Sequence, residues 1–413
     1  MQTNRHTKNT IKYYLILFFA LFFLFFSGDL GSIDVQKTAI VMAVGIDRTE
    51  NEFVVTSQIA IPKDSKQGKS SQTVQIVSTG KTVADALDEI NAKTGWYPKL
   101  VFCRLIILGE TAVAKNAFDS LEFFLLDEYL SDNCLIATCD GSAKDLLNQT
   151  ALVDDSGSVA MQKVLSPHAE RVGSALPSTL REFAIGYFSD SKSGYLPILT
   201  TKPQQEPPQN SQGGQNGQSG GQAQGGQGGS SGQSQGEQSG GAQENKPVFS
   251  ASETALFKNG KRVGKLTKEE TFAFTAVEKQ LKLAGYSVQA DEGYCTLNIK
   301  SNRKKKKLTL NGDIPVVELR LVLTAGVTDA TIGANADNVS DGGDIPSGAF
   351  STAEQLLSAQ ITSVFEKCKA LKCDLFGVNE SIQKYHQKAY KKLKNTAQET
   401  ALLQLSVVFE RVR

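Results

Sequence analysis

The stretch AIVMAVGIDRTENEFVVTSQIAI, residues 39–61, decides the fold of the first part of this chain. Two runs rich in Val, Ile and Ala, Ala39–Asp47 and Glu52–Ile61, flank the short polar segment 48–51. Because β-branched residues favour strands and a short polar break favours a tight turn, the stretch predicts a β-hairpin.

Strand and helix patterns alternate after this hairpin. Thr82 precedes a segment in which Val83, Leu87 and Ile90 fall on one helical face. Further strands are expected at Val74–Val77, Leu100–Leu108 and Asn133–Cys139, and further helices at Ala117–Tyr129 and Val159–Phe188. Such alternation predicts a mixed α/β or α+β domain over residues 29–200.

The composition changes abruptly at residues 201–247. Between Pro203 and Pro247 there is no aromatic side chain and no aliphatic side chain larger than that of Ala. A segment of Gly, Gln and Ser cannot bury enough apolar surface to offset its ordering entropy, so we expect a disordered linker that lets its flanking regions move independently.

A second folded region of mixed strands and helices is expected over residues 248–413. Thr254–Phe257 and Lys261–Leu266 flank Asn259-Gly260, a sequence typical of a hairpin turn. Ser351 and Glu354 have the spacing of a capping box at the start of a long helix. In that helix Leu357, Ile361, Val364, Cys368 and Leu371 form one apolar stripe, and a strand with alternating apolar residues, Leu403–Phe409, ends the chain.

The first residues indicate export or anchoring. A basic flank that contains Arg5, Lys8 and Lys12 precedes the apolar run Tyr13–Phe26, which has the length of a signal-peptide core. Ser27-Gly28 resembles the end of a lipoprotein signal, but Asp29 stands where the lipidated cysteine would be and has no thiol to acylate. Residues 1–28 are therefore predicted to be an uncleaved signal-anchor with the rest of the chain outside the cytoplasm.

The sequence contains few residues suited to catalysis. It has three histidines, of which His6 belongs to the basic flank. Ser166 and His168 could form a nucleophilic pair, but no nucleophile-elbow motif surrounds them, and His386 lies among Lys and Tyr. We therefore predict no catalytic residues and no enzymatic activity.

Metal and cofactor motifs are also missing. The six cysteines form no C-x-x-C pair, so they are expected to be small buried side chains, although their even number permits disulfides. Asp337, Asp341 and Asp344 share a Gly-rich loop that does not follow the EF-hand pattern. No metal, cofactor or phosphate-binding residue is predicted.

The charge balance gives no electrostatic support for binding nucleic acid or a strongly acidic partner, and no nucleic-acid partner is predicted. The chain has 44 basic and 43 acidic residues, which leaves a net charge of +1. The one dense basic run, Arg303–Lys307, has two interpretations: a contact with anionic lipid, or lysines on an exposed strand edge that discourage strand pairing.

Several motifs together resemble the Ger(x)C family, the C subunits of bacterial spore germinant receptors. Before the linker they are Ala39-Ile40-Val41 with Gly45-Ile46-Asp47, Gly80–Leu87, Ile106–Glu110, Gly141-Ser142-Ala143 and Gly194–Pro197. After it they are Ala255–Lys258, Val263–Leu266 and Cys373–Gly377. The order and spacing of these motifs cover nearly the whole chain except the linker, and Asp29 replaces the lipidated cysteine of the family.

This resemblance implies a non-catalytic module of about three subdomains on the outer face of the spore inner membrane. Its implied partners are a multi-pass A-type subunit and a permease-like B-type subunit, and its implied role is nutrient-induced germination. The alternative is a membrane-tethered solute-binding or envelope adhesion protein, for which an anchor and a tether would also suit. The sequence does not identify the binding residues.

Overall fold

The computed structural model describes residues 12–22, 38–61, 72–151, 154, 156–202, 247–290, 293–332, 348–394 and 396–412. Residues 12–22 are helical and their side chains are exposed. The predicted linker between 203 and 246, Asp29, and the loop with Asp337, Asp341 and Asp344 lie outside the described residues.

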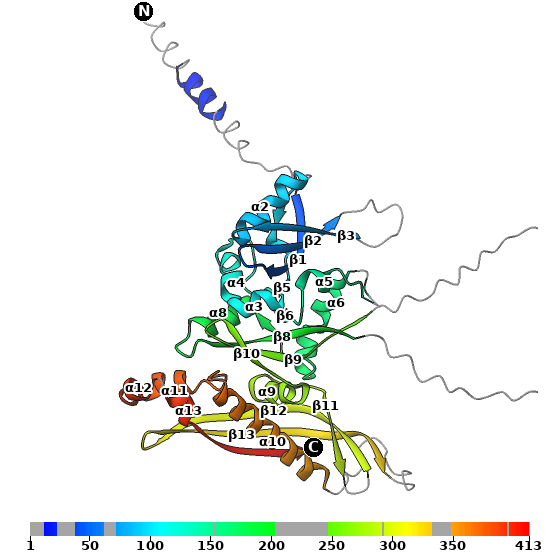
Figure 1. The fold of residues 1–413 in the computed structure, drawn as a ribbon, viewed down its shortest axis with the longest axis vertical. Helices are drawn as coiled ribbons and strands as arrows, with labels where there is room; N and C mark the ends of the chain where they lie inside the picture. The colour runs from blue at the N-terminus through cyan, green and yellow to red at the C-terminus, as the bar shows by residue number, and fades with distance from the viewer. Residues whose placement is uncertain are drawn as a thin grey trace, which may run out of the picture.

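The first sheet of the described chain has ten strands and occupies the upper half of the folded part in Figure 1. They are β1 (Thr38–Arg48), β2 (Phe53–Ile61), β3 (Gln72–Gly80), β4 (Tyr97–Lys99), β5 (Leu105–Leu108), β6 (Leu135–Cys139), β7 (Ser178–Thr179), β8 (Ser193–Lys202), β9 (Val248–Lys258) and β10 (Lys261–Leu266). Their order is β10-β9-β8-β6-β5-β1-β2-β3, with β4 beside β1 and β7 beside β6. The predicted hairpin is confirmed, since β1 pairs antiparallel with β2.

Helices cover both faces of this sheet, which explains its buried central strand. In β5, Ile106 and Leu108 face one core while Leu105 and Ile107 face the other, and all four are fully buried. One face carries α2 (Val83–Thr94), α3 (Glu110–Lys115), α4 (Ala117–Leu126) and α8 (Leu180–Phe188); the other carries α5 (Ala143–Leu147), α6 (Gly157–Val164) and α7 (Pro167–Arg171).

Two predicted elements differ from the observed ones. Leu100–Leu108 is not one strand, because the short 3-10 helix η3 (Leu100–Phe102) precedes β5 and leaves Val101 and Phe102 exposed. The expected helix Val159–Phe188 is divided into α6, α7, β7 and α8, with the break between α6 and α7 at Pro167, which begins a new helix.

The strands on either side of the predicted linker are partners in one sheet. β8 pairs antiparallel with β9, and Lys202 lies opposite Val248. This pairing argues against independent motion of the two regions, because Val248 begins a strand of the first sheet. Local sequence patterns could not predict this pairing, because the predicted linker separates the two strands along the chain.

Cleavage within residues 203–246 is expected to leave two fragments that remain associated. The β8–β9 hydrogen bonds and the cores on both sides of the sheet hold them together without the covalent link. Limited proteolysis followed by gel filtration tests this, with the same sample in denaturant as the control. Two fragments that elute separately under native conditions would contradict the shared sheet.

The second sheet lies in the lower half of Figure 1 and is made of long strands. Its order is β11 (Ala284–Ala290), β12 (Gly293–Asn311), β13 (Ile314–Ile332) and β14 (Leu402–Arg411). The helices of this region are α9 (Lys268–Glu278), α10 (Ala349–Ala370), α11 (Val378–Tyr385), α12 (Gln387–Leu393) and α13 (Ala397–Thr400). The prediction of a mixed α/β protein is confirmed.

Helix α10 packs on this sheet through the predicted stripe. Leu357, Ile361, Val364 and Cys368 are all buried in the second core. The predicted capping box is wrong: Gly348 is the N-cap, and the Glu354 carboxylate instead accepts a hydrogen bond from the Phe409 N–H on β14, at 2.8 Å. Glu354 therefore bonds to a distant strand and not to the start of its own helix.

Candidate functional site

The proposed Ser166–His168 pair does not assemble into a nucleophilic site. The Ser166 hydroxyl is the N-cap of α7 and accepts a hydrogen bond from the Ala169 N–H at 3.3 Å. Within the described chain no hydrogen bond joins this hydroxyl to the His168 ring, which is exposed. His386 lies between α11 and α12, where its N–H bonds to the Ile382 carbonyl at 2.7 Å.

The six cysteines are free and buried. Burial raises the pKa of Cys139 and that of Cys373 to about 12, so both thiols stay protonated at neutral pH. Among the described residues, no group of three His, Cys, Asp or Glu side chains is arranged to hold a metal ion.

The basic run Arg303–Lys307 lies on β12 beyond the part that pairs with β11, and no strand of the described residues pairs with that edge of β12 there. The Arg303 guanidinium is 3.3 Å from the Glu410 carboxylate, and the Lys304 ammonium donates to the Glu278 carbonyl at 3.1 Å. This location favours the strand-edge interpretation over a lipid contact.

Three motifs that carry the family resemblance meet at Asp47. Its carboxylate accepts hydrogen bonds from the Ser142 hydroxyl (2.9 Å) and from the N–H groups of Ala143 (2.9 Å) and Lys144 (3.0 Å), at the N-terminus of α5. The Gly109 N–H bonds to the carbonyl of Ile46 at 2.9 Å. A Cβ on Gly109 would lie 1.9 Å from an Asp47 carboxylate oxygen, so this contact requires glycine. These motifs hold the first sheet and α5 together.

Three further motifs meet where the two halves of the protein join. The buried Asp374 carboxylate accepts from the N–H groups of Val378 (2.9 Å) and Asn379 (2.8 Å) at the start of α11. The Asp374 N–H donates to the Ser193 hydroxyl on β8 at 2.9 Å. The Cys373 thiol lies 3.2 Å from the Phe257 carbonyl on β9 and 4.0 Å from the Gly194 carbonyl on β8. Burial raises the pKa of Asp374, and the two N–H donors oppose that rise.

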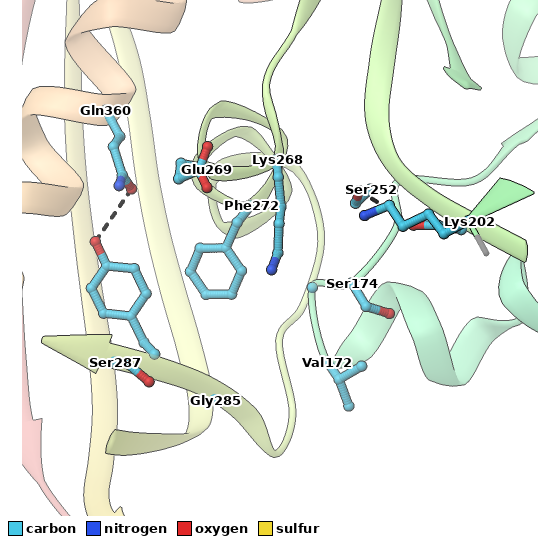
Figure 2. A pocket seen from close by; sticks show the side chains of 13 residues that line it. Val172, Ser174, Lys202, Ser252, Lys268, Glu269, Phe272, Gly285, Ser287 and Gln360 are labelled. Carbon is cyan, nitrogen blue, oxygen red and sulfur yellow. Dashed lines mark hydrogen bonds between the residues drawn. The ribbon is translucent and has the colours of Figure 1, made fainter. Parts of the chain in front are cut away.

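A cavity of about 570 Å³ opens between the first sheet and the second half of the chain (Figure 2). Its lining comes from the α7–β7 loop, β8, β9, α9, β11 and α10. In Figure 2 Phe272 and Lys268 extend from α9 into this space, and Lys202 and Ser252 lie across from them. Because Lys202 pairs with Val248, the predicted linker leaves and re-enters the sheet beside this cavity.

The cavity combines an aromatic wall with charged and hydroxyl side chains. The Phe272 and Tyr286 rings stack with their centroids 5.2 Å apart, and the Tyr286 hydroxyl donates to Gln360 at 3.2 Å. Burial raises the pKa of Tyr286 to about 12, so the phenol remains neutral. Lys202 and Lys268 supply positive charge, whereas the lining contains one carboxylate, Glu269, and neither histidine nor cysteine.

The sequence did not reveal this cavity. Its lining residues are spread over six elements, and each of them alone is an ordinary Lys, Ser or aromatic residue. One lining residue has a specific requirement at its position. Gly173 must be glycine, because its φ is 72° and a Cβ there would collide with the Phe272 ring.

Comparison with known proteins agrees with this architecture. The family model described as the spore germination protein N-terminal domain matches residues 31–201. A second family model, described as spore germination B3/GerAC like, C-terminal, matches residues 252–406. No curated protein sequence matches the chain.

One solved structure has the same fold. It is titled "Crystal Structure of the GerBC protein" and aligns with a TM-score of 0.50 at 15% sequence identity, over 90% of this chain and 97% of that one. The two family models cover both folded regions, in the order in which the motifs resemble the family. The chain therefore belongs to the Ger(x)C family, the C subunits of spore germinant receptors.

Proposed function

We propose that this chain is a non-catalytic subunit that acts by contact within a nutrient germinant receptor in the spore inner membrane. It would bind a multi-pass A-type subunit and a permease-like B-type subunit, and it would support assembly of the receptor or its signalling. The observation that carries the proposal is that residues of the family motifs make contacts inside the fold. Asp47, Gly109 and Asp374 all make internal contacts that fix one framework, and none of them lines the cavity.

A rigid framework of this kind supports an assembly role. The second core includes Leu256 and Leu266 from β9 and β10, so apolar packing as well as the Asp374 contacts joins the two halves. A change in the orientation of one half would then be transmitted to a partner bound to the other half. The test is whether spores that lack this chain still respond to nutrient germinants.

The proposal places the protein on the extracytoplasmic face of the membrane through residues 1–28. Among the described residues, no helix is both long and apolar enough to cross a bilayer. The support for an anchor is the apolar run Tyr13–Phe26, whose side chains in the described part, residues 13–22, are all exposed and belong to neither half of the fold.

The protein is expected to fractionate with membranes without incorporating fatty acid, because Asp29 lacks the thiol that lipidation requires. Labelling with a fatty-acid analogue and flotation of the membranes measure the two properties. Asp29→Cys is the matched variant and should gain the label. A soluble species that begins near residue 29, or a labelled wild-type chain, would contradict the signal-anchor.

The cavity favours a second candidate function, that of a membrane-tethered solute-binding protein. Two ammonium groups, several hydroxyls and an aromatic wall could hold a small solute that carries a carboxylate. Gene neighbourhood separates the two functions: a receptor subunit should be encoded beside its two membrane partners, whereas a solute-binding protein need not be.

A further inference from the structure

Six large apolar side chains are exposed in the segments that lead into β4, β5 and β6. We name them the apolar edge: Trp96, Tyr97, Val101, Phe102, Leu126 and Tyr129. Their exposed fractions run from 36% for Trp96 to 76% for Leu126. The Lys99 ammonium lies 5.1 Å from the centre of the Tyr129 ring and so connects the two segments that form this edge.

Topology brings these residues to one place. β4 and β5 both run parallel to β1, and β6 runs parallel to β5, so the segments that lead into these strands approach the sheet from the same end. β4 begins opposite Thr38, and β5 begins further along, opposite Ala43. The apolar side chains lie at or just before the start of β4, just before β5, at the end of α4, and in the loop between α4 and β6. The apolar edge is therefore a product of the fold and not a disordered end.

The same edge receives the chain from the proposed anchor. Tyr97 lies opposite Thr38, the first residue of β1. Residues 23–37 separate Thr38 from the exposed apolar helix of residues 12–22. Fifteen residues span at most roughly 50 Å when fully extended, so an anchored chain can bring the apolar edge to the bilayer and cannot move it further away than that span. The second sheet lies at the opposite end of the folded part (Figure 1).

The composition of the edge matches the boundary between lipid headgroups and acyl chains. Trp and Tyr concentrate at that boundary because each has an apolar ring and a polar group, and Lys extends its ammonium toward water. Single exposed apolar residues are ordinary, but a patch of six, three of them aromatic residues within seven positions of the chain, indicates a partner surface.

We infer that the apolar edge inserts into the headgroup layer of the membrane that holds the N-terminal anchor, and thereby fixes the orientation of the folded part. This inference rests on the proposed anchoring. The edge carries the ammonium of Lys99 and the carboxylate of Asp127, whose oxygen caps Tyr129 and Leu130. With opposite charges present, insertion depends on apolar burial and should change little with salt.

Trp96 is the only tryptophan of the chain and reports directly on this contact. The full-length protein is reconstituted in phosphatidylcholine vesicles with or without bromine on the upper acyl carbons, and the vesicles are collected by flotation. Trp96 emission should shift to shorter wavelength, and the brominated lipid should quench most of it at both low and high salt.

Two matched variants show whether the quenching belongs to this edge. Trp96→Phe combined with Tyr294→Trp moves the single tryptophan to an exposed position on the second sheet, where quenching should be absent. Phe102→Ser should weaken the quenching of Trp96, whereas Ile185→Ser, which removes a comparably exposed side chain from α8, should not. Circular dichroism checks that each variant is folded.

The outcomes separate the inference from the anchoring on which it rests. Protein that floats with the vesicles while Trp96 stays unquenched would overturn the inference and leave the anchor intact. Protein that does not float would overturn both. Quenching of Trp96 by aqueous iodide is measured as well. If the vesicles protect Trp96 from iodide but brominated lipid does not quench it, a second copy or a partner subunit covers these residues, and the inference is overturned.

Discussion

Leu357→Asp is expected to unfold the second half of the protein and to abolish its function in germination. Leu357 is fully buried between α10 and the second sheet, in the core that also contains Ile361 and Val364. The substitution removes a packed side chain and buries a carboxylate without a partner, which costs more than about 4 kcal/mol. That cost is a large part of the stability of a typical domain.

The adjacent residue of the same helix supplies the control. Leu356 is 43% exposed, so Leu356→Asp introduces the same charge one position away, where water can solvate it. We expect a change in unfolding free energy of about 0.5 kcal/mol or less for this variant. Denaturant unfolding followed by circular dichroism measures both. Equal losses in the two variants would show that the assignment of the buried face is wrong.

Gly109→Ala is the second variant with a large expected effect. The new Cβ would fall on the Asp47 carboxylate, which three donors hold at the N-terminus of α5. Displacing that carboxylate forfeits its charge-assisted hydrogen bonds, and we expect a loss of about 2–3 kcal/mol in the unfolding free energy. Asp47→Ala should cost a similar amount because it removes the same bonds.

A double-mutant cycle identifies the cause of this loss. If Gly109→Ala acts by displacing the carboxylate, it should add little once Asp47 is already Ala, and the double variant should be as stable as Asp47→Ala alone. Unfolding free energies of the four proteins give the coupling. Additive losses would mean that the new methyl group collides with the backbone instead, since the Ala143 nitrogen is the next group, at 3.1 Å.

Elements with a strong local pattern were predictable from the sequence. The hairpin of residues 39–61 and the stripe of α10 follow from periodicity, and β14 alternates along Leu403–Phe409 as expected. The turn at Asn259-Gly260 also forms, with positive φ at both residues, 50° and 75°. In each case the side chains that decide the structure are neighbours along the chain.

Features that depend on distant partners were not predictable. The pairing of β8 with β9 spans the predicted linker, and Glu354 binds the backbone of β14 instead of capping its own helix. One interpretation of the basic run Arg303–Lys307 placed it on a strand edge, but the sequence did not show that this strand is 19 residues long, because its length is imposed by pairing with β13. The cavity and the apolar edge arise in the same way, from residues that only the topology brings together.

The motif residues illustrate what a sequence pattern can and cannot tell. Gly45-Ile46-Asp47 and Cys373–Gly377 pointed correctly to the family, but their spacing did not reveal that Asp47 and Asp374 each cap a helix. A carboxylate in a motif is as compatible with catalysis as with capping until its donors are seen. Here the donors are backbone N–H groups at helix starts, together with the Ser142 hydroxyl at Asp47, which favours a structural role.

Germination of spores is the measurement that tests the receptor-subunit account most directly. Spores that lack this chain, spores complemented with the wild type, and spores complemented with His168→Ala and His386→Ala together are exposed to nutrients, with the amount of protein in the membrane measured in each. The account predicts loss of the nutrient response without the chain and a normal response in the double histidine variant. A normal response without the chain, or loss of response in the histidine variant at normal protein level and membrane location, would contradict it.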